Sequence, residues 1–181
     1  EVDIWLVKIK LQRNLIHSNA TLDVEYRIHA LQKLKACILK YENEINIAIR
    51  ADLGKCAFES YMCETGLVLS ELTYMIRHTR KFAKERTVRT PLAQFHSRSY
   101  QKPSPYGVTL IMSPWNYPVL LTLEPLIDAI AAGNTAVVKP SAYAPATAAV
   151  LKNILEECFP IEYVAVITGG RTENQALLQQ R

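Results

Sequence analysis

Residues 106–146 contain two short apolar runs separated by a longer apolar segment, and this pattern limits the fold more than any other stretch. The first run, residues 108–112, lies between Gly107 and Ser113-Pro114 and is too short for a helix. It therefore predicts a strand buried on both faces. The second run, residues 135–138, predicts another buried strand.

The segment between these runs, residues 117–132, is mostly apolar and stops at Gly133, a common residue at the end of a helix. Pro114 is expected in the first helical turn, where its missing N–H costs nothing. Strand, helix and strand with short joints form a βαβ unit with a right-handed crossover. The sequence therefore predicts a parallel sheet.

Polar side chains follow each of the two predicted strands at the point where the strand ends. Ser113 and Asn116 follow the first, and Lys139 and Ser141 follow the second. Ligands of open parallel sheets bind at this rim, outside the carboxyl ends of the strands. These residues, together with Trp115, are therefore candidates for a binding site.

The rest of the chain predicts an α/β protein in which N-terminal helices precede an edge strand and a partial doubly wound, Rossmann-like parallel sheet. We expect three regions: helices in residues 1–86, a linker and strand in 87–105, and the sheet in 106–181. The expected helices cover residues 2–16, 24–49, 57–84, 144–158 and 171–180, and Thr21 or Asp23 is the expected cap of the second. The second and third are expected to pack as an antiparallel pair. Further strands are expected at residues 95–101 and 163–167.

The composition is that of a globular protein, with 49% hydrophobic and 21% charged residues. Residues 1–105 hold 17 Lys/Arg and 11 Asp/Glu, and residues 106–181 hold 4 and 6, so the halves carry +6 and −2. The basic stretch 77–89 contains only one aromatic residue, Phe82, which favours a solvated face over a nucleic-acid site.

The four cysteines lack the spacing of a metal site, which indicates reduced thiols, no bound metal and a cytoplasmic location. We expect no signal peptide, since no early segment has the charge and apolar pattern of one. The longest apolar stretch, residues 119–132, contains Glu124, Pro125 and Asp128 and is a poor membrane span.

Three blocks in order, SPWNYP at 113–118, AAGN at 131–134 and VKPS at 138–141, resemble the aldehyde dehydrogenase family, most closely its class 3, fatty-aldehyde-type branch. The resemblance extends over about residues 24–181 and covers the N-terminal part of such a protein. It implies oxidation of a small-molecule substrate, an aldehyde, to a carboxylic acid with NAD or NADP. It also implies a homo-oligomer, with residues 87–105 joining a sheet between subunits.

The resemblance implies that Asn116 is catalytic, donating its amide N–H to the oxyanion that forms when a thiolate attacks the aldehyde. The alternative is that Asn116 only caps the helix that follows. Lys139 would contact the adenosine ribose, or else be a surface lysine at the sheet edge. Ser113, Trp115 and Ser141 would complete the cofactor site.

Two departures from the family pattern matter. Many members have a glutamate after KPS that binds the adenosine 2′-hydroxyl, and this chain has Ala142, so we expect NADP to be accepted as well as NAD. The family's nucleophilic cysteine, general-base glutamate and glycine-rich loop lie beyond Arg181. Gly169-Gly170 is more simply a turn than a cofactor loop. The chain therefore supplies half an active site, or is a non-catalytic dinucleotide-binding or dimerisation module of the same ancestry.

Overall fold

A computed structural model describes residues 2–180 of the chain. Its centre is a parallel sheet with the strand order β3-β4-β5, formed by Val108–Met112, Thr135–Lys139 and Val164–Val166. The crossover helices α6 (Leu120–Ala131) and α7 (Pro145–Cys158) connect these strands, and α8 (Arg171–Leu178) follows β5. The predicted α/β fold with a partial doubly wound sheet is confirmed.

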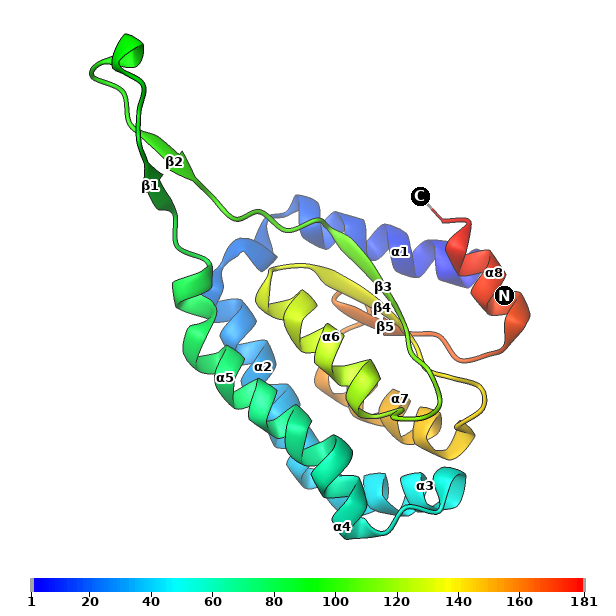
Figure 1. Cartoon of the computed structure of the whole chain (residues 1–181). Helices are drawn as coiled ribbons and strands as arrows, with labels where there is room; N and C mark the ends of the chain where they lie inside the picture. The colour runs from blue at the N-terminus through cyan, green and yellow to red at the C-terminus, as the bar shows by residue number, and fades with distance from the viewer. Residues whose placement is uncertain (1, 181) are drawn as a thin grey trace.

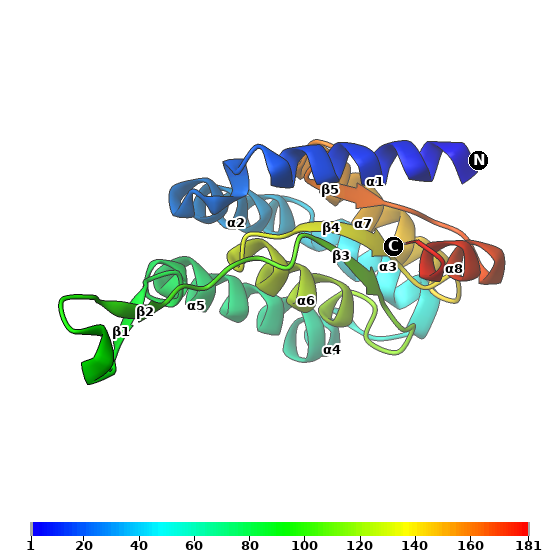
Figure 2. The same cartoon turned by 90° about the horizontal axis from the view of Figure 1, so that it is seen from above.

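Helices cover the sheet on both faces (Figures 1 and 2). On one face lie α6 and α7, and on the other lies α1 (Val2–His17). An outer layer behind α6 and α7 is formed by α2 (Val24–Lys40), α3 (Glu42–Leu53) and α5 (Gly66–Phe82). Successive residues of β4 serve both faces. Val138 belongs to the large core under α6 and α7, whereas Val137 packs with Ile9 of α1 and Leu177 of α8. This alternation explains why every residue of β4 is buried.

The first strand differs from its prediction, because β3 lies at the edge of the sheet. Only Ile111 is buried in β3, and Leu110 and Met112 are partly exposed. The apolar run predicted a strand correctly, but the prediction of burial on both faces was wrong. The helix after it also starts later than predicted, at Leu120, so Pro114 lies in a loop and not in a helical turn.

The expected single helix over residues 24–49 is two helices, α2 (Val24–Lys40) and α3 (Glu42–Leu53), which meet at Tyr41. Both keep the apolar spacing of three and four, so the periodicity does not reveal the break. Helix α2 packs on α5, α6 and α7, whereas α3 packs mainly on α7. Asp23 caps α2, because its side chain accepts the backbone N–H of Glu25 at 2.9 Å.

The predicted third helix begins as α4 (Ala57–Ser60) and continues as α5 (Gly66–Phe82), with a π-helical turn, η2 (Tyr61–Thr65), between them. The chain runs antiparallel in α2 and α5, as predicted (Figure 1). Gly66 suits the wide turn, because a Cβ there would lie 2.7 Å from the carbonyl oxygen of Tyr61. The apolar spacing of residues 57–84 did not predict this turn.

Residues 86–101 form a hairpin that projects from the body of the molecule (Figure 1). Strands β1 (Arg86–Val88) and β2 (Ser99–Gln101) pair antiparallel, and a short 3-10 turn, η3 (Leu92–Gln94), lies between them. The strand expected at 95–101 therefore starts only at Ser99. Leu92 and Phe95 in the loop are 88% and 76% exposed, and such exposure to water is unfavourable for large apolar side chains.

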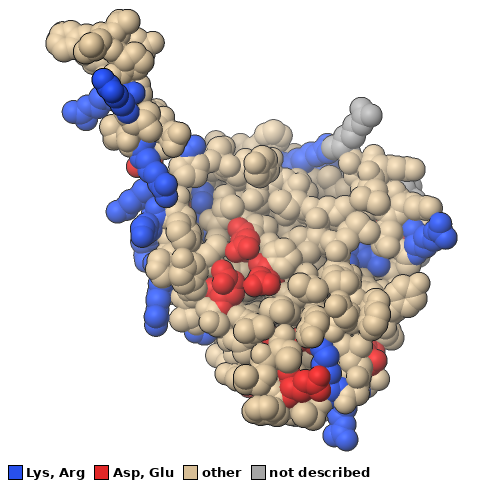
Figure 3. Space-filling model, in the orientation of Figure 1, with Lys and Arg blue, Asp and Glu red and all other residues tan. Residues whose placement is uncertain are grey.

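Charge is distributed unevenly over the surface seen in Figure 3. Lysine and arginine gather along the hairpin and the adjoining end of α5, and their side chains are exposed, as expected for a solvated face. Glu71 of α5 lies near Asp128 and Glu124 of α6, and burial together with these two carboxylates raises the pKa of Glu71.

Candidate functional site

The carboxyl ends of β3 and β4 lie side by side, as the topology predicted. In the register of the two strands Met112 is opposite Lys139, and the backbone N–H of Ser113 donates to the carbonyl of Lys139 at 3.2 Å. On the other side of β4, the backbone N–H of Ile167 donates to the carbonyl of Val138 at 2.9 Å. The chain segments that leave the three strands are therefore held at one rim of the sheet.

Lys139 is the last residue of β4 and is only 3% exposed. Its Nζ donates to the carbonyl of Pro140 at 3.0 Å. Burial lowers the pKa of Lys139, and the nearby Glu173 carboxylate partly opposes that change. The alternative of an exposed surface lysine was wrong, because the amine lies within the rim.

Beside Lys139, a cavity of about 430 Å³ opens between the ends of β4 and β5 and the start of α7. Ser141 and Ala142 line one side and Gly169 lines another, and the side chain of Lys152 in α7 places a positive charge in the cavity wall. The Ser141 Oγ accepts the backbone N–H of Tyr143 at 3.2 Å. Ala142 contributes only a methyl group to this lining.

Gly169 has a φ of +141° and lies close to Glu173, whose carboxylate accepts the N–H of Gly170. A Cβ on Gly169 would collide with the Glu173 side chain. The glycine pair therefore makes the turn into α8, as the simpler interpretation held, while Gly169 also lines the cavity.

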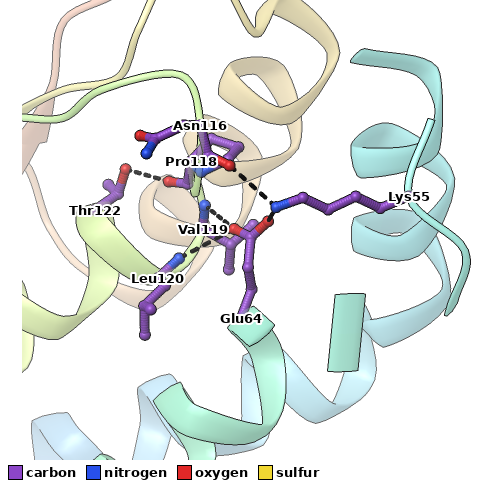
Figure 4. A network of polar contacts seen from close by, with 7 residues as sticks. All are labelled: Lys55, Glu64, Asn116, Pro118, Val119, Leu120 and Thr122. Carbon is purple, nitrogen blue, oxygen red and sulfur yellow. Dashed lines mark hydrogen bonds and ion pairs between the residues drawn. The ribbon is translucent and has the colours of Figure 1, made fainter. Parts of the chain in front are cut away.

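Asn116 lies in the loop between β3 and α6, and its side chain is exposed. Figure 4 shows its amide on the opposite side from its backbone carbonyl, which accepts a hydrogen bond from Lys55 Nζ at 3.0 Å. The alternative role as a helix cap was wrong. The N–H groups of Val119 and Leu120 at the start of α6 donate to Glu64 Oε2, at 2.8 and 3.3 Å.

The two other predicted residues of this loop have different surroundings. The Ser113 Oγ accepts a hydrogen bond from Thr122 Oγ1 at 2.6 Å, so its hydroxyl faces α6. Trp115 is 54% exposed and contributes an aromatic surface beside Asn116 in the sequence. The loop thus presents the side-chain amide of Asn116 and the indole of Trp115 at its surface.

The sequence analysis did not identify Lys55 and Glu64, two residues of the N-terminal helical region that hydrogen-bond to the backbone of the loop between β3 and α6. Their side chains form an ion pair of 2.7 Å, and the side chains are 12% and 0% exposed. Lys55 Nζ also lies 4.1 Å from the centre of the Tyr117 ring. Neither residue has a local signal for this role, because the loop groups that they contact are 55 or more positions away in the sequence.

Within the part of the chain that the structure describes, no three His, Cys, Asp or Glu side chains gather as metal ligands. Cys37 and Cys158 are buried and Cys56 is exposed, all as free thiols. None of the helices in residues 2–180 is both long enough and apolar enough to cross a bilayer.

Comparison with known proteins agrees with this architecture. A profile of the aldehyde dehydrogenase family matches residues 11–181. The 4,4'-diaponeurosporen-aldehyde dehydrogenase of Staphylococcus aureus is 42% identical over 162 residues, which cover 90% of this chain and 35% of that protein. The mouse aldehyde dehydrogenase family 3 member A2 is 36% identical over 93% of this chain and 35% of that protein.

Solved structures give the same result. A substrate-bound Staphylococcus aureus AldH superposes with a TM-score of 0.93 at 40% identity, over 96% of this chain and 38% of that one. An aldehyde dehydrogenase from Bacillus cereus shares the fold, with a TM-score of 0.86 at 21% identity over 99% of this chain and 37% of that one. The chain thus spans a little over a third of the length of these relatives. It belongs to the aldehyde dehydrogenase family, and its relatives include class 3 members, as the motifs predicted.

Proposed function

We propose that this chain is the N-terminal part of an NAD(P)-dependent aldehyde dehydrogenase that oxidises aldehydes to carboxylic acids in the cytoplasm. The observation that carries the proposal is the Asn116 loop. The loop follows an edge strand at the carboxyl rim of a parallel sheet, and its one unpaired amide is exposed. The names of the similar proteins, which act on aldehydes, support the reaction class.

In this proposal the Asn116 amide N–H stabilises the negative charge that forms on the aldehyde oxygen when a thiolate attacks the carbonyl carbon. A neutral amide suits this task, because it donates without a charge that must be desolvated. The thiolate comes from a cysteine outside these 181 residues. NAD or NADP, when bound, would supply the acceptor for the hydride that leaves the same carbon.

The cavity at the ends of β4 and β5 is the proposed adenosine site, with Ser141 in its wall and Lys139 beside it. Ser113 and Trp115 would shape the adjoining wall. The 2′-phosphate of NADP would meet no carboxylate at Ala142 and would lie near Lys152. Acceptance of NADP is therefore proposed along with NAD, and we expect Lys152→Met to weaken binding of NADP more than that of NAD.

Asn116→Ala tests the catalytic proposal in the full-length enzyme. Loss of one oxyanion donor should lower kcat by about 10²–10³-fold with little change in the dissociation constant of NAD. Asn116→Asp should lower kcat at least as much, because a carboxylate repels the oxyanion. A kcat within about threefold of the unaltered enzyme would overturn the role of Asn116.

The three expected regions carry different parts of the proposal. Residues 1–86 support the sheet from outside, 106–181 bear the cofactor and oxyanion sites, and 87–105 join subunits of a homodimer. Exposed Leu92, Phe95 and Tyr100 on the hairpin favour the last role, and with it the alternative of a dimerisation module. Sedimentation of a Leu92→Ser, Phe95→Ser variant tests this, since a module without its apolar surface should be monomeric.

A further inference from the structure

The loop that carries Asn116 is held at its beginning, its middle and its end. At the beginning, the Ser113 N–H bonds to β4. In the middle, Lys55 Nζ donates to the Asn116 carbonyl, and at the end Glu64 accepts the N–H groups of Val119 and Leu120. The last two attachments share one ion pair, Lys55 to Glu64 at 2.7 Å (Figure 4).

The Glu64 carboxylate is fully buried and has a partner at each oxygen. Oε1 accepts from Lys55, and Oε2 accepts from the start of α6, where the N-terminal N–H groups need an acceptor. Val119 is the residue at the cap position and its side chain cannot accept a hydrogen bond. Glu64 therefore replaces a local cap and fixes α6 against η2.

The π-helical turn is what brings Glu64 to this place. The backbone N–H of Gly66 donates to the Tyr61 carbonyl, five residues earlier, and the extra residue widens the turn at Glu64. Such π turns in helices are frequent at functional sites. Here the turn directs a buried carboxylate at the loop that holds the proposed oxyanion donor.

We propose that Lys55 and Glu64 are positioning residues that set the direction of the Asn116 amide. They act on the backbone that follows this amide, at the Asn116 carbonyl and at the first turn of α6. The side-chain amide stays free to donate to a substrate oxygen. This inference rests on the catalytic role proposed for Asn116, and it adds the pair that orients the group.

The first test needs no activity and uses the 181-residue chain. Lys55→Met keeps most of the apolar stem and removes the ammonium. We expect amide hydrogen exchange at Val119 to become about tenfold faster or more, together with greater mobility of the Asn116 side-chain amide by NMR. Lys35→Met is the matched control, since Lys35 is a partly buried lysine that donates to Thr73 Oγ1 at 2.8 Å, and it should leave both signals unchanged.

The second test is a double-mutant cycle on kcat in the full-length enzyme. Lys55→Met should lower kcat about tenfold with the NAD dissociation constant unchanged, and should lower it no further in an Asn116→Ala background. If Lys55→Met unfolds the protein, Lys55→Met with Glu64→Gln restores neutrality, keeps an acceptor for Val119 and serves in its place.

The outcomes separate the two proposals. Additive losses in kcat, or unchanged exchange and amide mobility in the chain, would overturn the positioning role while leaving Asn116 catalytic. A normal kcat in Asn116→Ala would overturn the catalytic role itself. The exchange experiment still decides in that case whether the pair orders the loop.

Discussion

Arg27 should contribute more to the stability of this chain than any exposed arginine. Its side chain is buried, at 7% exposure, and donates to three backbone carbonyls. Nε reaches Thr21 at 2.6 Å, Nη2 reaches Leu22 at 3.0 Å and Nη1 reaches Ala131 at 3.2 Å. One cation thus ties the connection between α1 and α2 to the last turn of α6, where a helix favours positive charge.

Arg27→Met keeps the apolar stem and removes all three donors. Hydrogen bonds from a charged group contribute about 1.5–3 kcal/mol each, but removal also relieves the cost of burying a guanidinium, so we expect a net loss of about 3 kcal/mol. For a chain of this length that lowers Tm by about 6–12 °C.

Calorimetry and urea denaturation measure this loss. The matched control is Arg80→Met, because Arg80 also makes close hydrogen bonds, both of 2.7 Å to Glu25, but with 58% of each side chain exposed. Water screens that pair, so the control should melt close to the unaltered chain. An equal Tm for Arg27→Met and the unaltered chain, or a larger loss from the control, would refute the reasoning.

Three further predictions concern other sites. Gly133→Ala should lower the free energy of unfolding, measured by urea denaturation, by about 2–4 kcal/mol, because φ is +88° and a Cβ would lie 2.8 Å from the Arg27 guanidinium carbon. Gly54→Ala is the control, with φ +72° and open space around the Cβ, and should lower it by only about 1 kcal/mol. Burial lowers the pKa of the Lys139 amine, so the charged amine destabilises the folded chain at pH 7, and this penalty disappears above pH 10.5, where the amine is neutral in both the folded and the unfolded chain. Lys139→Met should therefore stabilise the chain at pH 7 but not above pH 10.5. The same substitution should weaken dinucleotide binding. Iodoacetamide at pH 8 should label the exposed Cys56 well before the buried Cys158, because burial raises the pKa of the Cys158 thiol. Mass spectrometry of the labelled peptides measures the order, and earlier labelling of Cys158 would contradict the prediction.

The elements of the fold could be predicted where the sequence signal is local. Helix α7 begins at Pro145 and the three sheet strands fall in the predicted apolar runs, because periodicity and turn residues act over a few positions. The break at Tyr41 could not be predicted, because the apolar spacing of three and four continues across it. The edge position of β3 could not be predicted from its composition, because a short apolar run is typical of a strand buried on both faces.

The candidate site was predictable only to the level of the backbone. Parallel topology required Ser113 and Lys139 to end at the same rim, and a hydrogen bond of 3.2 Å joins them. The directions of the side chains depended on contacts from elsewhere. Burial of the Lys139 amine and the hold of Lys55 and Glu64 on the loop involve segments that no local pattern connects.

Carboxylates occupy the N-terminal ends of all three helices that follow the sheet strands. Glu64 accepts from α6, Asp52 accepts the N–H groups of Ala146 and Thr147 in α7 at 3.2 and 2.7 Å, and Glu173 closes the start of α8. A phosphate group cannot bind at these helix N-termini themselves, because their donors are already paired and a carboxylate lies at each. The rim is therefore suited to hydroxyl groups and a carbonyl oxygen, with Lys152 as the nearby cation in the cavity wall.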